Sequence, residues 1–544
     1  MTAPTDFPIP SDLQGFHFWD KMHCPRPQTA LTQDLFNKAI SQGFTGGMDE
    51  FACPVGVTYV NVNRYAYITL GPQPLGSETI EERVERYKGH LGHVLPNMRK
   101  LWEEEWLPSI LPGIKSAMER DYTALNDQEL VSTLEQMQQD FVARYVIHGK
   151  INFVIASAGL FVDFYNELMD PEDATEAYET QGYPTLSLDA GTALWELGRI
   201  VNKSSELSQS FERNQPGQLM IELESSDIGR SFLQAFKGYL DDWGWRSEAF
   251  ELADTTWRED PTVPLNAIQG YMRLDDSENP ENKYQQAIKR REELMVAARA
   301  AVAGDTERSG ALEALYAQAE SFATITENHN FYIDQRGNSV MRLPILEIGA
   351  RLVSHGRTAE INDVFHLDFD EIKAAFSGTD QNSLVSERKS ELEKWAKIVP
   401  VPTIGEPPDP EESAGDPLGM GFAKFFGVPP EPSRDPDIIQ GLGASPGVIQ
   451  GTAKVVRTLA EASKLEKGDI MVCEMTMPPW TPLFSIAGAV VADTGGPLSH
   501  CAIVSREYKM PCVVGTLFGT AVITDGMTLT VDGAKGIVRI DSRG

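Results

Sequence analysis

Positively charged residues are scarce in this sequence. Lysine and arginine total 47 against 79 aspartates and glutamates, which gives a formal net charge of −32 over 544 residues. A surface of this sign repels phosphate backbones and anionic lipid head groups. We therefore exclude nucleic acids and membrane surfaces as the main partners.

Cysteines are also few. The five are too scattered along the chain for a disulfide framework or for a paired-cysteine zinc site. We expect them to be reduced thiols in a cytosolic protein. They are Cys24, Cys53, Cys473, Cys501 and Cys512.

Long hydrophobic runs are missing as well. The longest, near 151–162 (INFVIASAGLFV), contains Asn152 and is too short for a bilayer core of about 30 Å, so it predicts a buried helix. The first ten residues show neither the basic nor the apolar part of a signal peptide. These features predict a soluble, cytoplasmic protein with no membrane partner.

Apolar residues and prolines are plentiful. Hydrophobic residues make up 41% of the chain, which is enough for real cores. Ten of the 34 prolines fall between 400 and 436, in an acidic stretch that predicts an extended linker without helix or central strand. An apolar island, Leu418–Phe426, could lie as a strap on a neighbouring domain. We predict domains over 1–399 and 437–544, joined by the linker 400–436.

The two predicted domains differ in pattern. Before the linker, apolar residues recur every three or four positions and predict helices, while alternation over 57–70 predicts a strand or hairpin. After it, short Val/Ile runs bounded by Gly, Pro or Asp predict strands around a helix over 499–508. The predicted fold class is α+β and multidomain, with a large, mainly helical domain followed by a small α/β domain. The predicted helices cover 81–106, 127–165, 186–211 and 282–303.

One constellation in the C-terminal part points to chemistry. A predicted strand ends in Thr494, Gly495 and Gly496, and glycines let a bulky group approach the main chain. Ser499 is a good N-cap, which places His500 in the first turn of a helix. Free N–H groups and the positive end of the dipole make that turn a natural phosphate site and favour a neutral, nucleophilic imidazole. We predict that His500 accepts a phosphoryl group and passes it on.

Other interpretations of these residues stay open. His500 could be a capping or packing residue, and Cys501 could be a nucleophile although no base is evident beside it other than His500. His90 and His93 lie at helical spacing but lack a third ligand, so we predict no metal site.

The whole stretch from 440 to 542 resembles a known domain. The string Thr494–Glu507 (TGGPLSHCAIVSRE) is similar to the swivelling phosphohistidine domain of phosphoenolpyruvate-utilising enzymes such as pyruvate phosphate dikinase, phosphoenolpyruvate synthase and rifampin phosphotransferase. The resemblance continues in Gly443–Gly451, Lys467–Cys473, Met510–Gly515 and Thr530–Gly536. It implies a dikinase-type phosphotransferase in which His500 carries the phosphoryl group and Thr494, Gly495, Gly496 and Ser499 form the phosphate loop.

The N-terminal part resembles the substrate domain of rifampin phosphotransferase more weakly. The similar segments are Phe18–Thr32, Glu327–Tyr332, Met341–Leu352 and Ile361–Phe365. No segment resembles the nucleotide domain, so the chain looks like one part of a split enzyme of the phenylphosphate or alkylphenol-phosphorylating (4-cresol) type. That resemblance implies a separate ATP-grasp-type subunit that binds ATP and Mg²⁺, a small phenolic substrate, and the products aryl phosphate, AMP and phosphate.

A phenol needs an apolar pocket with a few polar groups, and phosphoryl transfer needs cations and a base. For each residue offered for these roles, core packing, an ion pair or an ordinary hydrogen bond is the plainer interpretation. The substrate-binding candidates are Trp19, His23, Arg26, Arg64, His148, His329 and Arg342.

Two other functions fit the same residues. One is a hydroxyl or pyruvate phosphotransferase of the phosphoenolpyruvate synthase or rifampin phosphotransferase type. The other is a phosphocarrier module that relays phosphate to a second protein.

Overall fold

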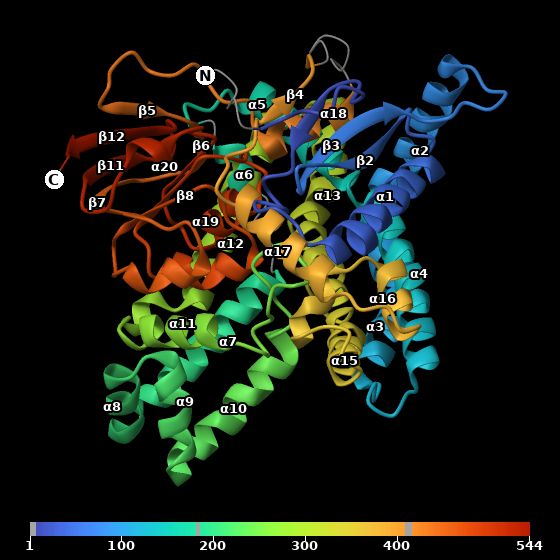
Figure 1. The fold of residues 1–544 in the computed structure, drawn as a ribbon. Coiled ribbons are helices and arrows are strands. Elements are labelled where there is room, and N and C mark those ends of the chain that lie inside the picture. The colour runs from blue at the N-terminus through green and yellow to red at the C-terminus, as the bar shows by residue number, and fades with distance from the viewer. Residues whose placement is uncertain (1–6, 174, 181–184, 408–415, 544) are drawn as a thin grey trace. The chain divides into compact units, whose positions relative to one another are not determined.

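The computed structural model describes residues 7–173, 175–180, 185–407 and 416–543, so part of the predicted linker (408–415) lies outside the described residues. The fold is α+β, with helices throughout and two sheets (Figure 1). The chain divides into two compact units. Unit 1 comprises Met1–Phe153, Ala249–Asp254 and Tyr332–Glu412, and unit 2 comprises Val154–Glu248, Thr255–Phe331 and Ser413–Gly544. The predicted division at 399/400 and 436/437 stays a prediction.

Unit 1 combines helices with a four-stranded antiparallel sheet in the order β2-β3-β1-β4. The predicted hairpin over 57–70 is confirmed as β2 and β3, and Asn63 and Arg64 make its turn with φ of 50° and 70°. The elements of unit 1 are β1 (His17–Trp19), α1 (Lys38–Glu50), β2 (Val55–Val62), β3 (Tyr65–Pro72), α2 (Ile80–Lys100), α3 (Leu107–Glu119), α4 (Asp127–Ile151), α14 (Gly337–Ser339), α15 (Arg342–Ser354), α16 (Phe369–Phe376), α17 (Asn382–Trp395) and β4 (Thr403–Ile404).

Helices α1 and α4 of unit 1 touch backbone to backbone through glycines. A Cβ at Gly47 would lie 2.1 Å from the Val146 oxygen, and one at Gly149 would lie 2.6 Å from the Phe44 oxygen. No side chain fits there without moving a helix. This contact holds α4 beside the first helix and close to the β2–β3 hairpin.

The first part of unit 2 is a set of helices, of which α7 to α11 enclose an apolar cluster that includes Leu194, Phe232 and Tyr271. Side chains cap the N-termini of α7, α8, α10, α12 and α13, as at Thr185, whose oxygen accepts from the Leu188 amide. The helices are α5 (Val154–Met169), α6 (Glu176–Glu179), α7 (Leu186–Asn202), α8 (Ser205–Arg213), α9 (Pro216–Glu224), α10 (Asp227–Trp243), α11 (Thr262–Met272), α12 (Pro280–Ala301) and α13 (Thr306–His329).

The second part of unit 2 holds an eight-stranded mixed sheet in the order β5-β12-β11-β7-β8-β9-β10-β6. Strands β7 to β10 are parallel, and the strands flanking them on both sides pair antiparallel. A core of Val, Ile, Leu and Met side chains covers it. The elements are α18 (Pro417–Phe426), β5 (Ile438–Gln440), β6 (Leu442–Ser445), β7 (Val448–Val455), β8 (Ile470–Cys473), β9 (Ala489–Ala492), α19 (His500–Glu507), β10 (Cys512–Val514), α20 (Gly519–Val522), β11 (Thr528–Asp532) and β12 (Ile537–Ser542).

The proline-rich segment departs from the prediction that it holds no helix. Helix α18 starts at Pro417, where the missing N–H costs no hydrogen bond, and spans the apolar island. It lies as a strap on α5: Lys424 pairs with Asp163 at 2.9 Å, and a Cβ at Gly421 would meet the Ile155 oxygen at 2.7 Å. The strap interpretation of this island is therefore confirmed. Upstream, the short strand β4 pairs with β1.

One helical stretch, Asp127–Met169, is long and apolar enough to cross a membrane by length and composition. In its most apolar window 78% of the residues are buried within the protein. Core helices of soluble proteins meet the same criteria, so this stretch is weak evidence for a membrane span.

Candidate active site

The loop Asp493–Ser499 leaves the carboxyl end of β9, a buried central strand in the parallel part of the sheet. The carboxyl ends of parallel strands are where open α/β sheets place their ligands. The Asp493 carboxylate anchors the loop, because it accepts hydrogen bonds from the Thr516 hydroxyl (3.1 Å) and the Thr520 hydroxyl (2.5 Å). Helix α19 then begins at His500, as predicted.

Gly495 and Gly496 have to be glycines because of a positive φ angle at one and a close backbone contact at the other. Gly495 has φ of +94°, and a Cβ at Gly496 would lie 2.1 Å from the Lys424 oxygen. The Gly496 N–H donates to the Phe425 oxygen at 2.8 Å, and the Leu498 N–H donates to the Lys424 oxygen at 3.2 Å. In this structure the group that approaches the turn is thus the end of α18. The phosphate-loop role of Thr494, whose hydroxyl donates to the Glu474 oxygen, stays a prediction.

Ser499 occupies the N-cap position of α19 but does not cap it with its side chain. Its Oγ is buried and has no hydrogen-bond partner among the described residues. The same holds for Nε2 of His500. At the head of this helix the Ser499 hydroxyl can therefore donate to an anion, beside the N–H groups of the first turn, and Nε2 of His500 is without a described partner.

The other nitrogen of His500 is firmly held. Its Nδ1 lies 2.9 Å from both carboxylate oxygens of Glu327, at the end of α13 in the same unit. The two side chains are 11% and 2% exposed. The Ser187 hydroxyl donates to the same carboxylate at 2.9 Å. An N–H at Nδ1 is the partner a carboxylate needs, so the neutral ring has its lone pair on Nε2.

Burial raises the pKa of Glu327, but the charge and hydrogen bond of His500, the Ser187 hydroxyl and the charge of His329 outweigh burial and lower it below its ordinary value. Glu507, at the far end of α19, is different. Burial first, and then the charge of Glu327, raise the pKa of Glu507 well above its ordinary value. Of these two buried carboxyl groups, Glu327 is the one that holds negative charge beside His500.

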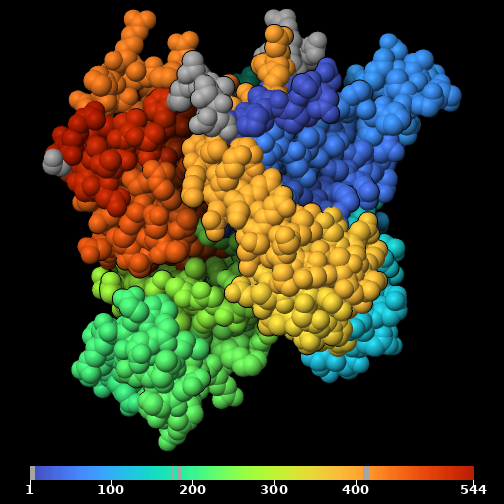
Figure 2. Space-filling view, in the orientation of Figure 1, coloured from blue at the N-terminus to red at the C-terminus, as the bar shows by residue number. Residues whose placement is uncertain are grey.

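Arg506 fixes helix α19 and the loop before it through hydrogen bonds. Its buried guanidinium donates to the Ala444 oxygen at 2.8 Å and to the Pro497 oxygen at 2.9 Å. Burial lowers the pKa of Arg506 to about 10, which still leaves it cationic at neutral pH. On the other side the Phe484 ring meets the His500 ring edge to face, 6.4 Å between centroids. Figure 2 shows this part of the chain, in orange and red, resting on the green helices that precede it in unit 2.

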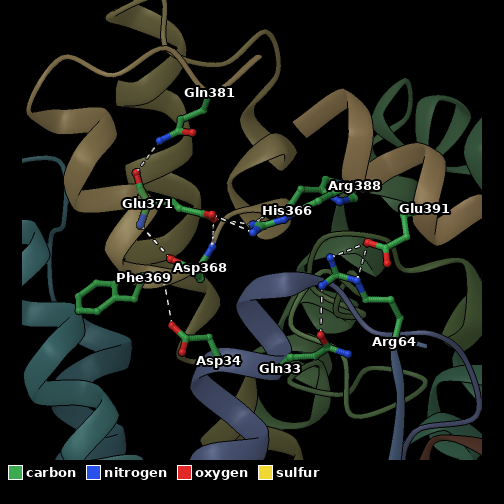
Figure 3. Close-up of polar contacts among 10 residues, drawn as sticks. All are labelled: Gln33, Asp34, Arg64, His366, Asp368, Phe369, Glu371, Gln381, Arg388 and Glu391. Carbon is green, nitrogen blue, oxygen red and sulfur yellow. Dashed lines mark hydrogen bonds and ion pairs between the residues drawn. The ribbon is translucent and has the colours of Figure 1, made fainter. Parts of the chain in front are cut away.

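Most of the predicted substrate-binding residues lie in unit 1. The three arginines have structural partners there. Arg64 bonds to Glu391 at 2.7 Å and to Gln33 at 3.1 Å, as Figure 3 shows. Arg26 pairs with Asp254 at 2.7 Å, and Arg342 donates to the Leu252 oxygen. Their roles in substrate binding stay predictions.

The other candidates are aromatic or histidine residues. Trp19 donates from its indole N–H to the Cys24 oxygen at 3.0 Å. His148 is buried, contacts Asp334 at 3.2 Å and stacks on Tyr145. His329, in unit 2, has its Nδ1 2.9 Å from the Ile325 oxygen of its own helix.

His23 also has a carboxylate partner. Its Nδ1 lies 2.9 and 3.0 Å from the two oxygens of Asp20. Sequence reasoning named neither Asp20 nor Glu327 as a site residue. The signals were present: Asp20 lies three residues before His23, and Glu327 is a carboxylate in a buried stretch of α13.

Two family models match parts of this chain. Residues 147–327 match the family model for the rifampicin phosphotransferase fourth domain, and residues 465–536 match the PEP-utilising enzyme mobile domain. Both Glu327 and His500 fall in matched regions.

Three curated relatives extend the likeness over more of the chain. Chondramide synthase cmdD of Chondromyces crocatus is 29% identical over 99% of this chain and 14% of its own length. The uncharacterized phosphotransferase YvkC of Bacillus subtilis is 27% identical over 98% of this chain and 63% of its own length. Rifampicin phosphotransferase of B. subtilis is 26% identical over 69% of this chain and 42% of its own length. The chain thus spans less than two thirds of each of these relatives.

Proposed function

Because the chain belongs to the PEP-utilising, rifampicin phosphotransferase-like family, we propose that it carries a phosphoryl group on Nε2 of His500 and transfers it to a hydroxyl acceptor. The observation that supports this most directly is the asymmetry of the ring. Nδ1 is bound by the Glu327 carboxylate, while Nε2 is buried without a described partner at the head of α19.

In the first half-reaction the Nε2 lone pair attacks the β-phosphorus of ATP, a P–N bond forms and the P–O bond to AMP breaks. Water then cleaves the bond between the β- and γ-phosphates, so phosphate leaves and one phosphoryl group stays on His500. The Glu327 carboxylate holds the Nδ1 proton and balances the positive charge that the ring acquires. The N–H groups of the first turn and the Ser499 hydroxyl are suited to the phosphoryl oxygens. In the second half-reaction the acceptor oxygen attacks, the P–N bond breaks, and its electron pair returns to Nε2.

The side chains that contact the His500 ring among the described residues are the Glu327 carboxylate and the Phe484 ring, which are unsuited to binding a nucleoside triphosphate. We therefore propose that ATP and Mg²⁺ bind on a separate ATP-grasp-type subunit, in the cytoplasm. The domain 437–544 would swivel on the linker 400–436 between that subunit and the substrate domain 1–399.

We propose a phenol of the 4-cresol type as the acceptor, with aryl phosphate, AMP and phosphate as products. Aromatic side chains of unit 1 support an apolar, ring-shaped acceptor. An acceptor panel tests this choice against pyruvate, other hydroxyl compounds and a second protein. Turnover of pyruvate without turnover of phenols would contradict it, and so would label found on a second polypeptide.

The carrier role is tested by incubating the chain with ATP labelled in its β- and γ-phosphates and with candidate ATP-binding subunits. We expect acid-labile, base-stable label on the wild-type chain and none on His500→Ala. Cys501→Ala is the matched control, since it alters the neighbouring residue and should keep the label. Label that persists in His500→Ala, or that is lost in Cys501→Ala alone, would overturn the assignment.

A further inference from the structure

A second pair of a carboxylate and an imidazole lies in unit 1, outside the His500 site. Asp20 follows β1, and its N–H donates to the Ala66 oxygen of β3 at 3.0 Å, so the sheet fixes its position. The Asp20 side chain is only 2% exposed, whereas that of His23 is 25% exposed. The pair therefore joins a buried carboxylate to a ring that solvent can reach.

Hydrogen bonds from His23 and Tyr59 hold the Asp20 carboxylate beside the ring. Nδ1 of His23 lies 2.9 and 3.0 Å from its two oxygens, and the His23 amide donates to it at 3.2 Å. The Tyr59 hydroxyl donates from strand β2 at 2.6 Å. With its proton on Nδ1, the ring presents a lone pair on Nε2, which accepts no hydrogen bond from a described residue. This is the geometry of a base held by a carboxylate.

The charges around the ring agree with that geometry. Burial lowers the pKa of His23, but the charge and hydrogen bond of Asp20, together with the charge of Asp334, outweigh burial and raise it. Burial raises the pKa of Asp20, but His23 and the Tyr59 hydroxyl outweigh it and lower it. Among the described residues, Asp20 and Asp334 are the charged groups that act on the His23 imidazole, and Tyr59 acts on it through Asp20. An ionised carboxylate thus backs a ring that gains a proton readily.

The surroundings suit an aromatic acceptor. The Phe250 ring stacks on His23 at 4.7 Å between centroids, with an angle of 25° between the ring planes. Phe36 meets Phe250 edge to face at 5.2 Å and Tyr145 at 5.7 Å. Apolar rings beside a partly exposed imidazole are what a phenol requires, because its ring is hydrophobic and its hydroxyl must meet an acceptor.

We propose that His23, positioned by Asp20, is the general base that takes the proton from the acceptor hydroxyl in the second half-reaction. The inference rests on the proposed function, because it needs a phosphoryl group on His500. The acceptor oxygen forms the new P–O bond as its O–H proton moves to Nε2 of His23. The P–N bond to His500 breaks and its electron pair stays on Nε2 of His500, so no further reactant is needed.

The test separates the two half-reactions. The full chain is phosphorylated with radiolabelled phosphoramidate, a small donor that replaces the ATP-binding subunit, and 4-cresol is then added. We expect His23→Gln to take up label on His500 as the wild type does. It should form aryl phosphate at least roughly 100-fold more slowly than the wild type. The wild-type transfer rate should rise with pH as the His23 ring loses its proton, and that rise should vanish in His23→Gln.

Asp20→Asn tests positioning, and should slow transfer while leaving labelling unchanged. His23→Ala should be partly rescued by added imidazole, which a merely structural histidine would not be. His355→Gln is the control, because His355 is a half-exposed histidine of unit 1 outside the pair, and it should transfer at the wild-type rate.

Failure of the proposed function has a different signature. If wild type and His500→Ala take up label equally, the carrier assignment fails. If labelled wild type and His23→Gln transfer to 4-cresol at equal rates, the base assignment fails alone. If wild type transfers nothing to 4-cresol, NMR of the His23 ring protons tests whether 4-cresol binds beside His23. A shift of these resonances on adding 4-cresol supports binding there, and the absence of a shift overturns the proposal.

Discussion

The Glu327 carboxylate determines how the His500 ring is held, because it binds Nδ1 and leaves Nε2 for chemistry. Glu327→Gln keeps the shape and removes the charge. At pH 7 we expect the substitution to lower the free energy of unfolding of unit 2 by about 1–3 kcal/mol, since a buried charged hydrogen bond is weakened. The measurement is the thermal unfolding midpoint.

The pH dependence of this effect has a definite sign. Because the folded-state pKa of Glu327 is below its ordinary value of 4.5, its stabilising contribution is present above 4.5 and is lost as the pH falls through the lowered value. The difference between wild type and Glu327→Gln should therefore close in acid. Glu393→Gln, at an exposed site, should shift the midpoint little at either pH. A difference of constant size from pH 7 to pH 3 would contradict this account.

Arg64 illustrates a residue whose described contacts are structural. It stands in the β2–β3 turn and holds Glu391 of α17 and Gln33 (Figure 3). We expect Arg64→Ala to cost about 1 kcal/mol of stability while His500 is labelled as before. A variant of unchanged stability with a raised KM for the acceptor would show instead that Arg64 binds substrate.

At the scale of elements, the contact between α18 and the glycine turn can be tested by a single substitution. A Cβ at Gly496 would lie 2.1 Å from the Lys424 oxygen, so Gly496→Ala has to push α18 away. We expect the thermal midpoint to fall and the segment 427–436 to be cut faster by protease. In Gly217→Ala, the matched control on α9, the new methyl group meets nothing within 4 Å. Equal behaviour of the two variants would contradict the strap.

The sequence predicts the strands after 448 well, because each Val/Ile run there is short and bounded by Gly, Pro or Asp. The proline-rich segment shows why composition alone misleads. Pro417 is harmless at the first helical position, and Gly421 serves a close contact with α5, so a helix forms despite its prolines. Both facts depend on packing partners that no local pattern contains.

The candidate site was only partly predictable for the same reason. Ser499 and His500 fall in one continuous motif, so local rules place them at the head of a helix. Glu327 lies 173 residues from His500 in sequence, and only the folded unit brings the two together. Asp20 could have been found, because an aspartate three residues before a histidine is a local pattern.

At the scale of the whole molecule, phosphorylation should change how the C-terminal part of unit 2 packs. Nε2 is buried in the structure, and a phosphoryl group there brings about two negative charges close to the ionised Glu327. We expect labelling with phosphoramidate to accelerate amide hydrogen exchange near Ser187 and at the end of α13. His500→Ala treated in the same way is the control. Unchanged exchange in the labelled wild type would contradict the prediction.

Helix α18 accepts hydrogen bonds from backbone N–H groups of the loop that could otherwise donate to an anion. The amides of Gly496 and Leu498 each carry one hydrogen, and both already point at carbonyls of α18. An oxyanion seated on this loop must either rely on amides further along, at the head of α19, or compete with those carbonyls for the same donors. An anion that used the Gly496 and Leu498 amides would therefore have to displace the end of α18 from the loop.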